Sequence, residues 1–339
     1  MTPKAVTSCA RRVTIKKNLL NISGASEEPV TERFWDAYFR SLKPLEVEEP
    51  IDVWVHRPPA YVLARILMPT KVSPNLVTVG SIILGLAAGA AIFASFSWHL
   101  PLAGILIFSS AVLDCCDGQL ARLRKSSSAF GRMLDGVADL VVSTVVVGGG
   151  AWLVMRKYHD PAWVFVVAGA LTVTTIVTGS FHTTMYDQFK NVFLRMTHPS
   201  YREGEDLEVA ERRFHEQRAQ MSFGLKLAWG IYFFYMRSQK DYADKFDPAA
   251  RRLLVELPVF SERNAAIYRK HAGKVMRVWR NYYGFGSLVF GLALSIGLNV
   301  TEYYLLFRLV LLNAGFYCYL RPEQRLASKR ALAEIASGV

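Results

Sequence analysis

Apolar residues gather in six long runs along the chain, and polar residues fill the segments between them. A helix needs about 20 mainly apolar residues to cross the hydrocarbon core of a bilayer, and five of the runs meet this requirement throughout. The sixth is apolar in its first half and then contains Asp114, Asp117 and Arg122. The pattern predicts six membrane-spanning helices, at 75–96, 100–124, 133–154, 162–181, 282–300 and 303–320.

Buried core helices of a soluble protein are the alternative explanation of such runs. That explanation suits a single run, but six runs joined by the short connectors 97–98, 157–160 and 301–302 favour a membrane protein. Tryptophans also stand at the ends of runs, where amphipathic rings favour the lipid interface. These are Trp98, Trp163 and Trp279.

The polar segments predict how the rest of the chain is organised. Apolar residues recur at helical spacing over 58–68, which predicts a short interfacial helix before Pro69. The 16 apolar residues of 221–236 contain Lys226 and are short for a span, so we expect an interfacial helix or part of a small helical domain. The fold class expected is an all-α polytopic membrane protein, a six-transmembrane-helix bundle with an N-terminal interfacial helix and a helical cytoplasmic insert. Its parts are an N-terminal arm (1–50, with at most a short helix near 31–42), the interfacial helix with transmembrane helices 1–4 (51–186), the insert (187–280), transmembrane helices 5–6 (281–320) and a tail (321–339).

Composition and charge sharpen this picture. The chain is 52% hydrophobic, which excludes intrinsic disorder, and its four cysteines include the adjacent pair Cys115 and Cys116, which excludes a secreted disulfide framework. The N-terminus lacks the apolar core of a signal peptide. Of the 40 Lys and Arg residues, 37 fall on the side of the two termini and the insert, so these parts are expected in the cytoplasm. The net charge of +12 then favours anionic lipid and nucleotide phosphate as partners over nucleic acid.

Four aspartates lie inside predicted spans, where carboxylates are costly. Asp114 and Asp117 are three residues apart and Asp135 and Asp139 are four apart, so each pair shares one face of its helix. The two helices are joined by a tight turn, and all four side chains can converge. An ionised Asp at membrane depth costs about 2.5 to 3.5 kcal/mol, so four cost roughly 10 to 14 kcal/mol, comparable with the stability of a whole domain. A cation must compensate them.

Three interpretations of the aspartates compete. Salt bridges to Arg122, Arg124 or Arg132 account for one or two carboxylates but not for four directed at one point. A transporter uses intramembrane aspartates as an ion or proton relay. A metal site is the third, and oxygen-only ligands suit Mg²⁺ or Mn²⁺, while no His or Cys stands at a spacing typical of zinc. The residues alone favour the metal site.

The full spacing is specific. The chain reads Asp114-x2-Asp117-Gly118-x2-Ala121-Arg122-x8-Gly131-x3-Asp135-x3-Asp139, and in this it resembles the class I CDP-alcohol phosphotransferase family at every specified position. The resemblance extends to the six-helix plan, the interfacial helix and the 73–78 entry to the first span. It covers about 51–186 and 281–320.

The resemblance implies an activity and a set of site residues. Members of this family transfer a substituted phosphate from a CDP-linked alcohol, often CDP-diacylglycerol, to an acceptor hydroxyl and release CMP. By similarity, the metal-site residues are Asp114, Asp117, Asp135 and Asp139, and Asp139 is also the catalytic base. The resemblance also implies two Mg²⁺ or Mn²⁺ ions per site, a homodimer, and CDP contacts at Gly118, Ala121, Arg122 and Gly131.

The acceptor pocket is not defined by the sequence. A phosphorylated acceptor needs a basic pocket, for which the candidates are Arg65, Lys71, Arg132, Lys190 and Arg280, although each is equally explained as an interfacial anchor. His56 and Arg57, which precede the predicted interfacial helix, are candidate headgroup contacts, and His182 and Tyr186 are candidates at the cytoplasmic end of the fourth span. A cation-coupled transporter and a catalytically inactive CDP-lipid-binding relative stay as the alternative functions.

Overall fold

The computed structural model describes residues 34–126, 129–158, 161–199, 211–212, 214–216, 218–256 and 260–337. The chain divides into two compact units, Met1–Arg40 and Ser41–Val339. In the first unit the described helix is α2 (Phe34–Arg40), which agrees with the short helix expected near 31–42. The rest of the predicted arm up to residue 33, the middle of the 125–130 turn and residues 200–210 of the insert lie outside the described residues.

A short helical segment enters the second unit. The π-helical turn η1 (Asp52–His56) leads directly into α3 (Arg57–Leu67), which carries proline in its first turn and ends just before Pro69. The predicted helix at 58–68 is confirmed, and its placement at the lipid interface stays a prediction.

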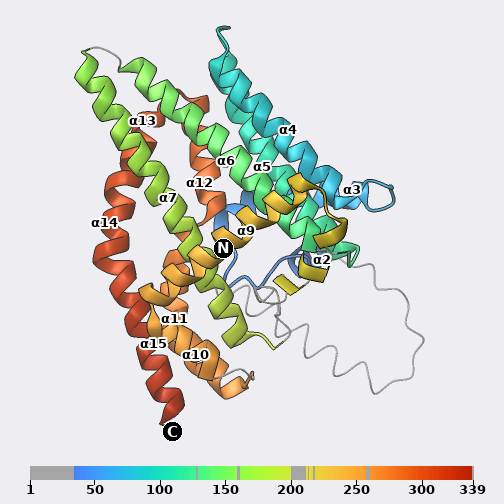
Figure 1. The fold of residues 1–339 in the computed structure, drawn as a ribbon, viewed down its shortest axis with the longest axis vertical. Coiled ribbons are helices and arrows are strands. Elements are labelled where there is room, and N and C mark those ends of the chain that lie inside the picture. The colour runs from blue at the N-terminus through green and yellow to red at the C-terminus, as the bar shows by residue number, and fades with distance from the viewer. Residues whose placement is uncertain are drawn as a thin grey trace. The chain divides into compact units, whose positions relative to one another are not determined.

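Four long helices follow (Figure 1): α4 (Pro74–Phe93), α5 (His99–Leu123), α6 (Ala129–Lys157) and α7 (Ala162–Thr197). Ser73 caps the N-terminus of α4, because its hydroxyl accepts a hydrogen bond from the Leu76 amide at 3.2 Å. Helix α4 packs against both α5 and α6. Glycines make the approach to α6 possible, because a Cβ at Gly89 would lie 2.2 Å from Val145 Cγ1.

The C-terminal part contains a short helix and a long one. Helix α12 (Phe285–Gly297) has 13 residues, whereas a single helical stretch runs from Thr301 to Ala336 through α13 (Thr301–Leu306), η3 (Phe307–Leu312), α14 (Asn313–Gly315), η4 (Phe316–Leu320) and α15 (Arg321–Ala336). Within the described residues, five helices are long and apolar enough to cross a membrane: α4, α5, Met133–Lys157, α7 and Thr301–Ala336. The run at 282–300 forms a helix shorter than the ~20 residues of a full span, so the sixth span stays a prediction.

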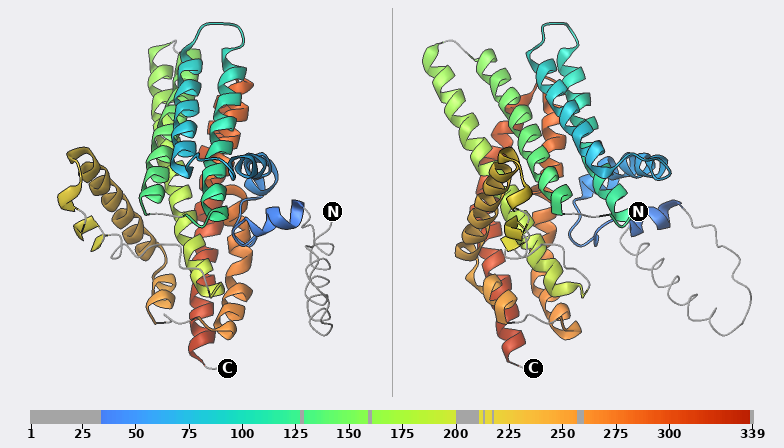
Figure 2. Two further views of the ribbon diagram at one scale, coloured as in Figure 1. Left: turned by 90° about the vertical axis from the view of Figure 1, so that its right-hand side faces the viewer. Right: turned by 45° about the vertical axis from the view of Figure 1, so that its right-hand side comes forward.

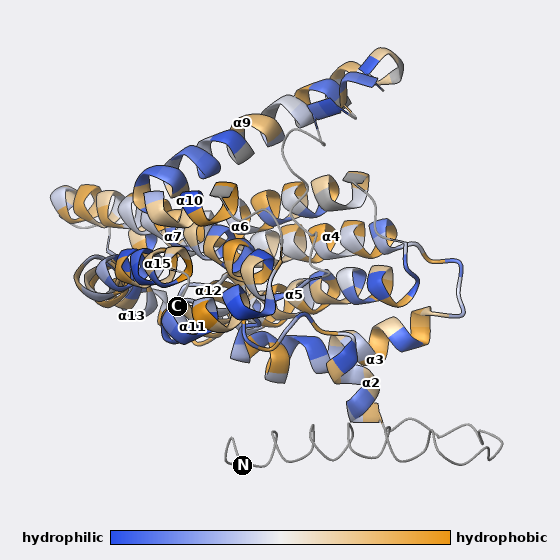
Figure 3. Cartoon of the chain, turned by 90° about the horizontal axis from the view of Figure 1, so that it is seen from below, coloured by the Kyte–Doolittle hydropathy of each residue, from blue (hydrophilic) through white to orange (hydrophobic). Residues whose placement is uncertain are grey.

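The predicted insert is helical. Helix α7 continues through the expected boundary at residue 187 to Thr197, and the helices beyond it are α9 (Phe223–Phe246), α10 (Pro248–Glu256) and α11 (Glu262–Tyr282), with a 3-10 turn, η2, at Arg218–Gln220. Helix α11 packs on α7 and α15, and α10 packs on α15. Both views of Figure 2 show these helices side by side. Aromatic side chains fill this junction, among them Phe189, Trp279 and Phe316. Residues 223–236 of the apolar run at 221–236 lie within α9, which Figure 3 shows with long hydrophilic stretches.

Candidate active site

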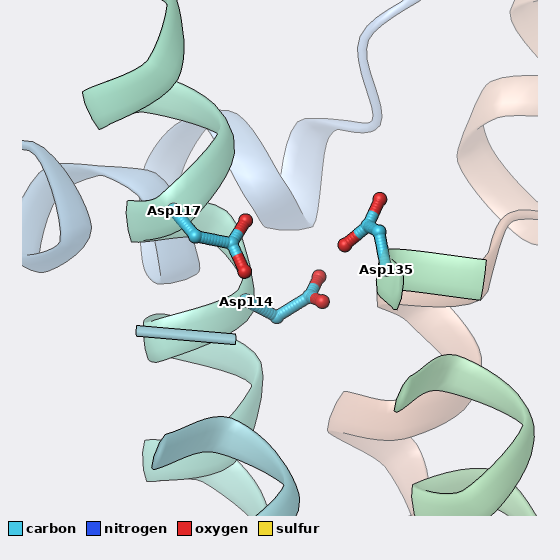
Figure 4. Close-up of side chains that lie close together, drawn as sticks. All are labelled: Asp114, Asp117 and Asp135. Atoms are coloured by element: carbon cyan, nitrogen blue, oxygen red, sulfur yellow. The ribbon is translucent and has the colours of Figure 1, made fainter. Parts of the chain in front are cut away.

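Three of the predicted metal ligands lie together. Asp114 and Asp117 project from α5 toward Asp135 on α6, as Figure 4 shows. One carboxylate oxygen from each comes within 4.8 Å of the other two. The spacing of three residues directs the α5 pair to one side, and the short α5–α6 connection brings the third aspartate to the same level.

Helix α4 sets the rotation of α5 and orients one carboxylate. The Thr78 hydroxyl donates to Asp117 Oδ2 at 2.5 Å, and one turn along, the Ser110 hydroxyl donates to the Ser81 carbonyl at 2.8 Å. From the first bond to the second, the residue number rises on α4 (Thr78 to Ser81) and falls on α5 (Asp117 to Ser110), so the two helices are antiparallel. A buried hydroxyl that donates to a ligand carboxylate fixes its orientation, as outer-shell partners do at metal sites.

The aspartates open into a cavity of about 350 Å³. Seven carboxylates and four cations are among the described residues that line it, which leaves three negative charges unmatched when all are ionised. The carboxylates are Glu49, Asp52, Asp114, Asp117, Asp135, Asp139 and Asp187, and the cations are Lys43, Arg57, Arg122 and Lys190. Such an excess in a partly buried cavity favours bound cations.

Salt bridges account poorly for this excess. The Arg124 guanidinium donates to the carbonyls of Leu67, Met68, Thr70 and Val72 in the α3–α4 connection. Arg122 Nε donates to the Ser41 carbonyl at 3.0 Å. Arg124 is therefore engaged with backbone rather than with an aspartate.

The other motif residues take different positions. Asp139, Gly118 and Arg122 line the same cavity, although Asp139 lies outside the three-carboxylate cluster. Ala121 and Gly131 are not among the described lining residues. The side chain of Arg132 lies outside the described part of the chain.

The acceptor candidates separate into two groups. His56, Arg57, Tyr186 and Lys190 line the cavity, and Lys190 pairs with Asp187 on α7. The remaining candidates lie elsewhere: Arg65 and Lys71 are exposed, Arg280 donates to the Leu45 and Glu48 carbonyls, and His182 packs against Tyr283 and Phe316.

Three lining carboxylates have no counterpart among the predicted site residues. They are Glu49, Asp52 and Asp187. Glu49 accepts from the Gly286 amide at 3.1 Å and from the Ser287 amide and hydroxyl at 2.9 and 2.8 Å, so it caps the N-terminus of α12. Burial, reinforced by the neighbouring charge of Asp52, raises the pKa of Glu49 to about 8. For Glu49 and Asp52, the available signal in the sequence was the acidic residues directly before the predicted helix at 58–68.

The clustered aspartates lie on two helices that are long and apolar enough to cross a membrane, and they line one charged cavity. A sequence-family model described as CDP-alcohol phosphatidyltransferase matches residues 71–194, which include the whole aspartate motif. The chain therefore carries a CDP-alcohol phosphatidyltransferase domain over these residues.

Curated relatives agree with this assignment. The chain is 34% identical over 132 residues to a bifunctional IPC transferase and DIPP synthase of Thermococcus kodakarensis, which covers 38% of this chain and 27% of that protein. It is 31% identical over 109 residues to a phosphatidylinositol phosphate synthase of Corynebacterium glutamicum, covering 31% and 49%. A CDP-diacylglycerol–serine O-phosphatidyltransferase of Helicobacter pylori is 40% identical over 73 residues, covering 22% and 30%. The chain thus spans at most about half the length of these relatives.

Proposed function

We propose that this protein is an integral membrane CDP-alcohol phosphotransferase of phospholipid synthesis. It transfers the substituted phosphate of a CDP-linked alcohol to an acceptor hydroxyl and releases CMP. The observation that carries the proposal is the cluster of Asp114, Asp117 and Asp135 within 4.8 Å, inside the matched domain. We propose CDP-diacylglycerol as the donor, since the names of relatives from Helicobacter pylori and Pectobacterium atrosepticum specify it.

The residues of the cluster fit a divalent metal. They offer oxygen ligands only, which suits Mg²⁺ or Mn²⁺, and the Thr78 hydroxyl already holds one ligand in place. We propose that Asp114, Asp117 and Asp135 hold these ions and that Asp139 lies close enough to share in a second site. Bound divalent ions supply charge neutralisation for the diphosphate and for the departing CMP.

The remaining steps fall to the side chains of the cavity. Asp139 accepts the proton of the acceptor hydroxyl while the oxygen of that hydroxyl forms a bond to the β-phosphorus. The bond between that phosphorus and the oxygen of CMP breaks, and CMP keeps the electron pair. Gly118, Ala121 and Gly131 leave room for the nucleotide, and Arg122 contacts its phosphate. Positioning and charge neutralisation supply most of the catalysis in such transfers.

The orientation and assembly belong to the same proposal. The excess of Lys and Arg in the termini and insert supports a cytoplasmic active site, where the positive-inside rule places such segments. A homodimer is proposed by family resemblance.

The test measures CMP release by purified protein from CDP-diacylglycerol and a panel of alcohols. Release is expected with Mg²⁺ or Mn²⁺, is expected to stop with EDTA, and is expected to fall by at least about 100-fold in Asp139→Asn, the range for loss of a general base. Asp241→Asn, an exposed carboxylate on α9, is the matched control and should keep full activity. Release without divalent metal, or full activity of Asp139→Asn, contradicts the mechanism.

The same preparation separates the alternatives. Asp139-dependent cation flux into liposomes without CMP release would establish the transporter. Metal-dependent binding of CDP-diacylglycerol without turnover on any alcohol would establish an inactive binding protein.

A further inference from the structure

Besides the aspartates of α5 and α6, the cavity contains a polar pair on the N-terminal segment, Asp52 and His56. The His56 ring is fully buried, and its Nδ1 lies 2.8 Å from Asp52 Oδ1. Phe108 and Phe290 flank the ring at centroid distances of 5.5 and 5.9 Å. Nε2 has no hydrogen-bond partner among the described residues. A buried imidazole nitrogen without a partner is costly, so it favours a ligand that supplies one.

Close packing against α12 holds this pair in place. A Cβ at Gly286 would lie 2.1 Å from Asp52 Oδ1, so only glycine permits the observed approach. Glu49, three residues before Asp52, is fixed by three hydrogen bonds to Gly286 and Ser287 at the N-terminus of α12. Asp52 and His56 are therefore preorganised before any substrate binds.

The order of residues along α5 indicates which substrate meets the pair. Phe108, which contacts His56, precedes Asp114 by six residues, or about 9 Å of helix, whereas Arg122 follows Asp114 by eight, or about 12 Å. Arg122 and the nearby Gly118 belong to the proposed CMP side. Phosphoryl transfer places the attacking and leaving oxygens roughly in line, so the acceptor approaches from the Phe108 side.

Asp139 lies on that same side. Helix α4 is antiparallel to α5, as the Thr78–Asp117 and Ser81–Ser110 bonds show. It is parallel to α6, since Gly85 meets Val142 and Gly89 meets Val145. Helices α5 and α6 are consequently antiparallel, and the step from Asp135 to Asp139 leads away from Arg122 toward His56.

The charges of this half of the cavity indicate the kind of acceptor. Arg57 Nη2 pairs with Glu48 Oε2 at 3.0 Å, and Lys190 pairs with Asp187. A phosphate monoester needs cations that donate charge-assisted hydrogen bonds to it. Three lining cations lie outside the motif, namely Lys43, Arg57 and Lys190, and the last two already donate to carboxylates. Carboxylate and imidazole acceptors suit the O–H donors of an uncharged alcohol.

We propose that Asp52 and His56 form a hydroxyl-binding subsite for the acceptor, and that this subsite takes a neutral, hydroxyl-rich alcohol rather than a phosphorylated one. The proposal rests on the proposed function. Nδ1–H donates to Asp52, and Nε2 accepts a hydrogen bond from an acceptor hydroxyl, while Asp139 remains the base. The pair binds the acceptor and does not contact the donor.

The first experiment compares Michaelis constants of the two substrates in His56→Gln and Gly286→Ala, at saturating Mg²⁺. Each variant should raise KM for the acceptor about 10- to 100-fold, the equivalent of one buried hydrogen bond, and change KM for CDP-diacylglycerol less than about threefold. The glycine variant displaces Asp52 without altering His56, so it tests the pair if the histidine variant does not fold. Gly136→Ala is the matched control, because its Cβ meets no described heavy atom within 4 Å.

The second experiment offers matched acceptors: glycerol against glycerol 3-phosphate, and inositol against inositol 1-phosphate. The neutral member of the productive pair should show a kcat/KM at least about tenfold higher. Preference for the phosphorylated member, an unchanged acceptor KM, or an equal rise in both KM values overturns this inference and leaves the proposed function standing. Absence of CMP release with every acceptor overturns the proposed function, and the inference with it.

Discussion

Gly118 offers a way to separate the fold from nucleotide binding. An added Cβ at this position would meet Arg122 Nη1 at 3.4 Å and Nη2 at 4.0 Å, which is ordinary van der Waals contact. Gly118→Ala therefore fits the protein without a ligand. Because Gly in a helix interior is less favourable than Ala by roughly 0.5 to 1 kcal/mol, the variant should be unchanged or slightly more stable.

The same methyl group should weaken the binding of CMP. It extends about 1.5 Å from the Cα into the cavity that Gly118 lines. A nucleotide group that lies against this Cα must withdraw by a similar distance, far enough to break one charge-assisted hydrogen bond. Such a bond is worth about 1.5 to 3 kcal/mol, so the dissociation constant of CMP should rise roughly 10- to 150-fold.

The assay is titration calorimetry of CMP in detergent with Mg²⁺, paired with thermal unfolding. Gly136→Ala and Gly148→Ala are the controls, since an added Cβ at either meets no described heavy atom within 4 Å. Both controls should bind CMP like the original protein. If Gly118→Ala binds CMP with unchanged affinity, the nucleotide does not approach this backbone and the reasoning is refuted. If it loses affinity and stability together, the effect is on the fold.

Three further perturbations follow from the structure. Gly104→Ala should cost about 1 to 3 kcal/mol of stability, measured by denaturant unfolding, because its Cβ would lie 2.6 Å from the Ala293 backbone oxygen. Thr78→Val removes the hydroxyl that holds Asp117, and Mn²⁺ affinity by electron paramagnetic resonance should fall about 10- to 100-fold. Glu49→Gln tests the raised pKa of Glu49. In the original protein, protonated Glu49 stabilises the fold, and this contribution of at most about 5 kcal/mol is fully present below pH 4.5 and is lost as the pH rises to about 8. The melting temperature of the original protein should thus fall relative to Glu49→Gln across that window.

Each of these predictions has a control or a contradicting result. Gly148→Ala should leave stability within about 1 kcal/mol, and equal losses in both glycine variants would contradict the close α5–α12 approach. Thr174→Val removes a hydroxyl that donates to Ala170 on the same helix, and it should not affect Mn²⁺. Parallel pH profiles for the original protein and Glu49→Gln would show that Glu49 does not titrate between pH 4.5 and 8.

The spacing of residues was sufficient to predict the helices and the aspartate cluster. Helical periodicity places Asp114 and Asp117 on one face, and a short connection returns the chain beside it with Asp135. Both inferences use neighbours in sequence, so no tertiary information is needed. Hydropathy over about 20 residues likewise predicted α4, α5 and α6 with bounds within four residues of those observed, whereas α7 extends 16 residues beyond its predicted end.

Of the other half of the cavity, charge and position indicated His56, Arg57, Tyr186 and Lys190, but not Glu49, Asp52 and Asp187 or the contacts between residues far apart in the chain. Glu49 reaches Gly286 and Ser287 across more than 230 positions, and no local pattern marks that contact. The span predicted at 282–300 contains the 13-residue α12, and composition did not show that Tyr282 ends α11. Exposed Arg65 and Lys71 were plausible by charge and position alone.

The two halves of the cavity differ in how their charges are balanced, and this difference supports a division of labour. On α5 and α6 four lining aspartates stand against one lining cation on the same helices, Arg122, and Arg124 is committed to backbone carbonyls. On the N-terminal segment and α7, three lining carboxylates stand against the three lining cations Lys43, Arg57 and Lys190. Unmatched carboxylates favour divalent ions and, through them, the diphosphate, whereas a balanced wall leaves hydrogen bonding as its means of recognition.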